Sequence, residues 1–152
     1  MKFEKFLKGV GTHGQILTRE NGDKWLVCAG VGMKVPAGVE NLLGAGEVSD
    51  KTKVIVEALV NADTDDRVEL KRAYISADGK ASDIVRIFSG TNYLLEDIEV
   101  GIHNADFGLL EKGDKRLAYV EVEDEDTTKY LLILNQDKDV IGFIEGRNYE
   151  SR

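Results

Sequence analysis

The sequence predicts a single compact α+β domain, mainly of antiparallel β-strands in hairpins and a meander, with a short N-terminal amphipathic helix. Three observations predict this fold class. Short apolar or alternating runs recur along the chain, turn residues separate them, and clear helical periodicity is confined to few segments. A length of 152 residues, 42% of them hydrophobic and 32% charged, is typical of one globular domain. We divide the chain into an arm with a glycine hinge (1–14), a mainly β domain (15–146) and a tail (147–152).

The N-terminal arm has the pattern of an amphipathic helix. Phe3, Phe6, Leu7 and Val10 follow the spacing i, i+3, i+4 and i+7, which places them on one helical face. The glycines that follow loosen the backbone. Such an arm either docks on a partner or packs onto its own domain. These four apolar residues are the partner-binding site that the sequence predicts.

A hairpin and a long loop follow the arm. Gln15–Glu20 and Lys24–Cys28 flank Asn21-Gly22, a dipeptide that favours a tight hairpin turn. The glycine-dense stretch Ala29–Gly46 contains the only proline and predicts an irregular loop. Ordered loops of this length are often functional.

The middle of the chain is ambiguous between helix and strand. Ser49–Val60 begins with an N-cap serine, and we favour a helix there, although its β-branched run Val54–Val56 favours a strand. Asp66–Ser76 and Ala81–Phe88 predict two strands around the turn Asp78-Gly79. The second of these segments also fits helical spacing.

The last third predicts an antiparallel meander of four strands joined by short polar turns. The four runs are Phe107–Glu111, Arg116–Glu123, Thr128–Leu134 and Val140–Glu145. The final run overlaps Ile144-Glu-Gly-Arg147, which coincides with a familiar protease recognition tetrapeptide. We interpret it as a natural strand end before a frayed tail, with an engineered cleavage site as the alternative.

Charge and cysteine content exclude several classes of partner and compartment. Asp and Glu outnumber Lys and Arg by 28 to 20, so a net charge of −8 disfavours nucleic acid and anionic lipid. No apolar stretch is long enough to span a bilayer, and no secretory signal is recognisable. The single cysteine, Cys28, precludes an internal disulfide and suits a reducing compartment. We therefore expect a cytoplasmic protein.

No motif predicts catalysis or a bound cofactor. The glycine pairs near residues 11–14, 30–32 and 44–46 do not complete a phosphate-binding motif, so turn glycines explain them better. Cys28 with His13 or His103 would make a thiol nucleophile and its base. Cys28 ends an apolar run, however, where a buried and inert thiol is the ordinary outcome. We expect no catalytic residues and no cofactor.

Two acidic loops resemble calcium loops incompletely. Asn135, Asp137 and Asp139 alternate as oxygen ligands do, but Val140 replaces the required glycine and Gly146 the terminal acid. The Asp63–Asp66 loop fails the same comparison, because its twelfth position is a tyrosine. We expect no metal site.

The chain as a whole resembles the small acidic proteins encoded among the structural genes of tailed bacteriophages and prophages of Gram-positive bacteria. The stretches that carry the resemblance are Lys2–Gly14, Asn21–Cys28 and Asn104–Asp114. The resemblance is one of overall character and transfers no functional residue. It implies a head-associated virion component of the capsid-decoration type, incorporated into the virion after synthesis in the host cell.

The leading functional hypothesis is therefore a non-enzymatic structural or interaction module that docks through its arm onto a protein, either a second copy or a virion assembly. Burial of Phe3, Phe6 and Leu7 in a groove would drive the docking. The alternative is a small-ligand-binding protein or enzyme that uses the Ala29–Gly46 loop. A concave pocket with converging polar groups would favour the alternative, and a flat domain with an extended arm would favour docking.

Overall fold

A computed structural model describes residues 1–11, 13–39, 48–62, 68–69, 72–76, 85–91, 95–111, 114, 116–122 and 127–147. It confirms the predicted class, an α+β domain of mainly antiparallel strands with a short N-terminal helix. The larger sheet has the strand order β1-β2-β3-β10-β9-β8-β4, and a smaller sheet has the order β5-β6-β7. The elements of the larger sheet are β1 (Gln15–Thr18), β2 (Lys24–Cys28), β3 (Val31–Lys34), β4 (Val68–Glu69), β8 (Arg116–Val122), β9 (Thr128–Leu134) and β10 (Val140–Glu145).

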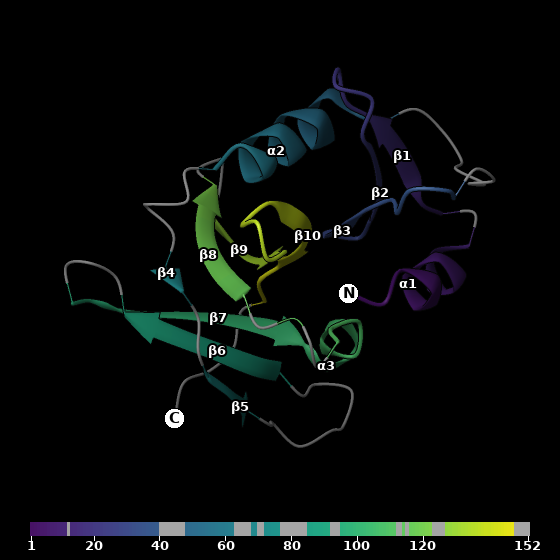
Figure 1. Cartoon of the computed structure of the whole chain (residues 1–152). Helices are drawn as coiled ribbons and strands as arrows, with labels where there is room; N and C mark the ends of the chain where they lie inside the picture. Colours follow the sequence, from purple (N-terminus) through teal and green to yellow (C-terminus); the bar gives the residue numbers. More distant parts are fainter. Residues whose placement is uncertain are drawn as a thin grey trace.

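The elements stack in layers around the larger sheet (Figure 1). Helix α2 (Asp50–Val60) covers one face. Helix α1 (Phe3–Val10) and the small sheet of β5 (Arg72–Ser76), β6 (Val85–Thr91) and β7 (Asp97–His103) cover the other. Two hydrophobic clusters fill the two interfaces.

Strand β9 shows why the larger sheet lies in the middle. Tyr130 and Leu132 belong to the cluster beneath α2, whereas Leu131 and Ile133 belong to the cluster beneath α1 and the small sheet. Because successive side chains point to opposite faces, a strand that is covered on both sides needs a continuous apolar run. The run Tyr130–Leu134 meets that need, and it sits between β8 and β10 as the predicted meander requires.

The hairpin of β1 and β2 is confirmed, but its turn is longer than the sequence predicts. The connecting loop runs from Arg19 to Asp23, and the Arg19 amide donates to the Asp23 carbonyl at 2.8 Å. Only Gly22 has a positive φ, 92°, and the Asn21 side chain accepts from the Asp23 amide. The Asx turn replaces the two-residue turn.

The prediction of an irregular loop from Ala29 to Gly46 is wrong at its start. Cys28 pairs with Val31, so Ala29 and Gly30 form a two-residue turn that leads into β3. Both have positive φ, 50° and 82°, as a type I′ hairpin turn demands. Residues 40–46 of the predicted loop lie outside the described residues.

Helix α2 is confirmed against its strand alternative. The hydroxyl of Ser49 accepts from the Thr52 amide at 3.2 Å, as an N-cap does. Val56 and Leu59 face the sheet and are fully buried. Within the β-branched run, Val56 and the partly buried Ile55 pack against the sheet while Val54 is exposed, and this packing outweighs the weak helix propensity of the run.

The small sheet corrects one prediction and confirms another. The segment Asp66–Ser76 divides into β4 and β5, which belong to different sheets. The described part of Ala81–Phe88 belongs to strand β6, which confirms the predicted strand over its helical alternative. Strands β5 and β6 pair as predicted, while Asp78-Gly79 lies outside the described residues. Strand β7 was not predicted, although Ile98, Val100 and Ile102 alternate with polar residues.

The segment Phe107–Glu111 is not a strand. It follows the short helix α3 (Asn104–Phe107) and continues as turns, with the amide of Leu109 donating to the Asp106 carbonyl. The side chain of His103 caps this helix by accepting from the Ala105 amide at 3.1 Å. Leu109 is buried, so this apolar run enters the core from a turn. The meander therefore consists of β8, β9 and β10 alone.

None of the helices in the described part of the chain has the length and apolar character that crossing a membrane requires.

Candidate functional site

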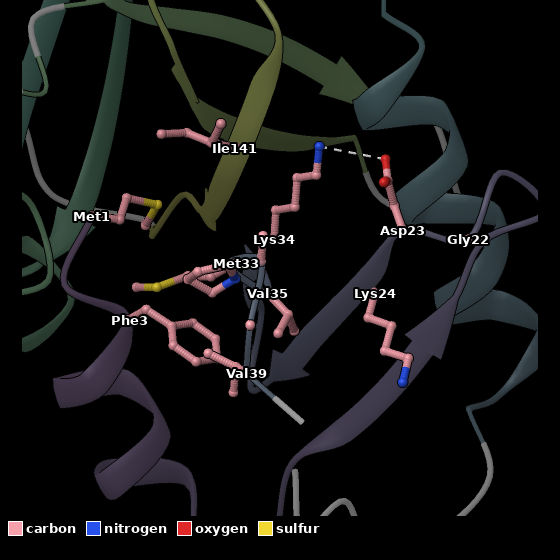
Figure 2. Close-up of a pocket in the computed structure, with 13 residues that line it drawn as sticks. Met1, Phe3, Gly22, Asp23, Lys24, Met33, Lys34, Val35, Val39 and Ile141 are labelled. Atoms are coloured by element: carbon pink, nitrogen blue, oxygen red, sulfur yellow. Dashed lines mark ion pairs between the residues drawn. The ribbon is translucent and has the colours of Figure 1, made fainter. Parts of the chain in front are cut away.

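A groove of about 620 Å³ opens beside the start of α1 and the end of β3. We call it the α1–β3 groove (Figure 2). Its wall is apolar and its margin carries two lysines and one aspartate. The wall residues are Met1, Phe3, Met33, Val35, Val39 and Ile141, and the margin residues are Asp23, Lys24 and Lys34.

Local backbone bonds shape the β3 side of the groove. The amide of Val35 donates to the Lys24 carbonyl at 2.8 Å and extends the β2–β3 pairing by one residue. The chain then turns, with Gly38 at a φ of 90° and the Val39 amide within 3.4 Å of the Pro36 carbonyl. This turn brings Val39 back beside Val35 and Phe3 (Figure 2).

The N-terminus is anchored at the other side of the groove. The α-ammonium group of Met1 lies 2.8 Å from a carboxylate oxygen of Asp114, and the two side chains are only 4% and 10% exposed. Asp114 also accepts from the Glu111 amide at 2.8 Å. The Lys2 amide donates to the Leu109 carbonyl. These bonds fix Met1, so the wall that it forms with Phe3 is preorganised.

The charged side chains at the margin differ in whether they form ion pairs. The ammonium of Lys34 lies 3.5 Å from the Asp23 carboxylate, which Arg19 approaches to 3.8 Å. Lys24 makes no ion pair within the described part of the chain, and its side chain points away from the Lys34–Asp23 pair (Figure 2). The groove thus suits an apolar group with an acidic group beside it.

The predicted partner-binding residues lie mostly elsewhere. Phe3, Phe6 and Val10 are 8%, 6% and 4% exposed, and together with the half-buried Leu7 they pack in the core beneath the larger sheet. The arm therefore packs onto its own domain, the second alternative raised by the sequence. Of the four residues, only Phe3 also lines the groove.

Part of the alternative site, the Ala29–Gly46 loop, does line the groove. Residues 33–39 of that stretch line the groove, as a concave site requires. Its polar groups do not converge, however, because Lys34 and Asp23 bind each other. The other wall residues, Met1 and Ile141, were not singled out in the sequence. The type I′ turn at Ala29-Gly30 is the signal that would have revealed β3.

The candidate catalytic residues are not arranged as a nucleophile and base. Cys28 is a free thiol at the end of β2 and is half-buried, so it is less covered than the sequence predicts. The Nδ1 atom of His103 is engaged in capping α3. His13 donates its backbone amide to the Val10 carbonyl just after α1.

The acidic loop after β9 is organised by its own backbone. The side-chain oxygen of Asn135 accepts from the amides of Asp137 and Asp139, both at 2.9 Å. Over the ranges that the structure describes, no three His, Cys, Asp or Glu side chains are grouped to hold a metal ion. The Asp63–Asp66 loop lies outside those ranges.

Shifted pKa values occur away from the groove wall. Burial raises the pKa of Asp106 in α3, against the opposing effect of Arg147 and His103. Burial also raises the pKa of Tyr119, with a further contribution from its hydrogen bond to Glu121. The Arg19 guanidinium lowers the pKa of Glu57 in α2 through a hydrogen bond. These groups lie on different elements, α3, β8 and α2, and none of them lines the groove.

No family model matches this chain, and neither a curated protein nor a solved structure matches it.

Proposed function

We propose that this protein is a non-enzymatic interaction module whose α1–β3 groove receives a large apolar side chain of a protein partner. The observation that carries the proposal is the groove itself, a hollow of about 620 Å³ with apolar side chains on its wall and two lysines and an aspartate at its margin. Buried apolar anchors surrounded by a polar rim dominate the binding energy of protein interfaces.

The distribution of polar groups favours a protein over a small ligand. Small-molecule sites fix their ligand with several polar groups that converge. In the groove, Lys34 and Asp23 bind each other and Lys24 stands apart from that pair, so the charged groups do not converge on one point. A protein segment needs no such convergence, because the rest of its interface orients it. The fixed position of Met1 further reduces the ordering cost of binding.

The setting that we propose is a phage or prophage structural assembly, with the protein made in the host cytoplasm and incorporated into the virion. This part of the proposal rests on the resemblance in overall character. A repetitive assembly would strengthen a weak single contact through avidity.

A small amphipathic anion is the second candidate occupant. The volume of the groove lies within the range of ligand pockets, roughly 300–1,000 Å³. Lys24 at its margin would meet an anionic head group while the wall covers the apolar body.

Selection from a random peptide library against the immobilised protein tests the proposal. We expect enriched peptides in which a large apolar residue stands beside Asp or Glu. Their binding should shift the methyl resonances of Val35, Val39 and Ile141, and it should weaken at least about tenfold in the groove-blocking variant Ala37→Trp. The exposed-surface variant Val54→Asp, on α2, is the control and should bind normally.

A parallel titration with dodecanoate separates the two occupants. Saturable binding of dodecanoate at the same methyl groups, without any enriched peptide, would replace the protein partner by a small anion. Peptides that bind Ala37→Trp as well as the unmodified protein would contradict the proposed site.

A further inference from the structure

One leucine stands out on the surface of the molecule. Leu95 is 84% exposed, and together with Val54 it makes up the large hydrophobic side chains that are exposed in the described part of the chain. Leu95 also has a φ of 62°, a left-handed conformation that non-glycine residues rarely adopt. Both its solvation and its backbone are unfavourable in the isolated molecule. Backbone conformations of this kind cost energy and concentrate at sites that use them, which makes Leu95 a candidate contact residue.

Leu95 precedes two acidic residues at the start of β7. Glu96 and Asp97 are both exposed, and Asp97 pairs with Thr91 where the β6–β7 hairpin closes. The described end of this hairpin therefore presents one apolar side chain followed by two carboxylates. We call Leu95–Asp97 the hairpin tip.

The hairpin tip has the chemistry that the α1–β3 groove suits. The apolar wall of the groove would cover Leu95, and Lys24 at its margin would face the carboxylate of Asp97. Lys24 is a cation without an ion pair in the described ranges, within a chain whose net charge is −8.

The hairpin tip cannot reach the groove of its own molecule. Figure 1 shows the start of β7 at the left end of the view, whereas α1 and β3 lie at the right. A contact between the two surfaces must join two copies.

We propose that Leu95 of one copy inserts into the α1–β3 groove of a second copy, with Asp97 facing Lys24. This inference rests on the proposed function and names its partner. Because the two surfaces differ and lie at opposite ends, the contact is head-to-tail and can repeat, closing a ring or extending a filament. One leucine anchor gives a weak contact, which repetition strengthens.

Complementation between two variants tests the proposal. The tip variant Leu95→Asp keeps its groove, and the groove variant Ala37→Trp keeps its tip. In sedimentation velocity at about 0.15 M salt, where repulsion between the acidic molecules is screened, we expect concentration-dependent association of the unmodified protein. Each variant alone should associate at least about tenfold more weakly. An equimolar mixture should form heterodimers and nothing larger, since one productive contact remains.

Matched controls separate a specific contact from general surface effects. Val54→Asp removes the other exposed hydrophobic side chain, and Lys51→Glu with Lys53→Glu repeats a charge reversal on α2. All of these controls should associate like the unmodified protein. Asp97→Lys should weaken association, and adding Lys24→Glu should restore part of it. Thermal melts confirm that each variant is folded.

A protein that stays monomeric up to about 1 mM, a concentration at which even weak contacts populate, overturns the inference. The inference is also overturned if a mixture of the two variants forms no heterodimer. It is overturned as well if Val54→Asp weakens association as much as Leu95→Asp does. If selected peptides still bind the groove of a monomeric protein, only the self-association fails and the proposed function stands. If they do not bind there, both fail.

Discussion

Individual residues decide how closely the layers pack. Gly32 lies in β3 opposite Phe143 of β10, and a Cβ atom added to Gly32 would overlap the Phe143 ring. That ring stacks against Trp25 with centroids 5.9 Å apart and meets Tyr130 edge-on. The absence of a side chain at position 32 therefore permits the aromatic cluster beneath α2.

We predict that Gly32→Ala lowers the free energy of unfolding by about 1–3 kcal/mol, because Phe143 must leave its place between Trp25 and Tyr130. Urea denaturation measures the change. Gly9→Ala is the matched substitution, since a Cβ atom there meets nothing within 4 Å. Lying within α1, it should stabilise by about 0.5–1 kcal/mol. Equal effects at both positions would contradict the packing argument.

Asp106 in α3 predicts a pH effect. Burial raises its pKa above the ordinary value, so the folded state binds this proton more tightly than the unfolded state. The stability from the protonated form is complete below the unfolded pKa and is lost as pH rises through the folded pKa. At pH 7 the ionised carboxylate is therefore unfavourable, despite its attraction to Arg147 and His103.

Asp106→Asn should consequently raise the melting temperature at neutral pH, and the gain should shrink toward pH 3. Thermal melts across this range measure the difference between the variant and the unmodified protein. A gain that grows on acidification, or a loss at pH 7, would show that the ionised carboxylate is stabilising.

At the scale of elements, one ion pair ties the first hairpin to α2. Arg19 donates from Nε to Glu57 at 2.8 Å and from a terminal nitrogen at 3.2 Å, and Asn61 donates to the same carboxylate at 3.0 Å. Two nearly parallel hydrogen bonds give this pair a fixed geometry. The pair also holds Arg19 close to Asp23, and so connects α2 with the groove margin.

We predict a coupling of about 0.3–1 kcal/mol between Arg19 and Glu57 in a double-mutant cycle with Arg19→Gln and Glu57→Gln. Because Arg19 lowers the pKa of Glu57, this stability is present above the unfolded pKa of the carboxyl and is lost as pH falls through its folded pKa. The cycle measured at pH 7 and again near pH 3 should therefore lose its coupling in acid. A coupling that persists in acid would mean that packing, not charge, joins the elements.

At the scale of the whole molecule, the layered fold separates the two surfaces that we propose to meet. The hairpin tip belongs to the small sheet, while the groove lies where α1, β3 and β10 come together. A molecule with complementary surfaces at opposite ends is suited to a repeating assembly. Its net charge of −8 opposes non-specific association, so only a contact with local complementarity would persist.

The sequence by itself determined the elements whose pattern is local. The apolar run of β9, the flanking strands β8 and β10, the hairpin of β1 and β2 and the capped start of α2 all follow from spacing, turn residues and an N-cap. These signals act between near neighbours in the chain, so they are readable without the fold. The alternation of Ile98, Val100 and Ile102 in β7 is an equally local signal.

Only the tertiary structure determined which apolar faces pack against each other. The periodicity of Phe3, Phe6 and Val10 demands burial, yet it is the same whether a partner or the chain's own core provides it. The groove likewise combines the N-terminus and β3 with Ile141, which lies more than a hundred positions from both in the sequence. A local apolar pattern shows that one face of an element must be buried, whereas long-range packing determines which residues cover that face. The groove forms where this packing leaves a hollow at the surface.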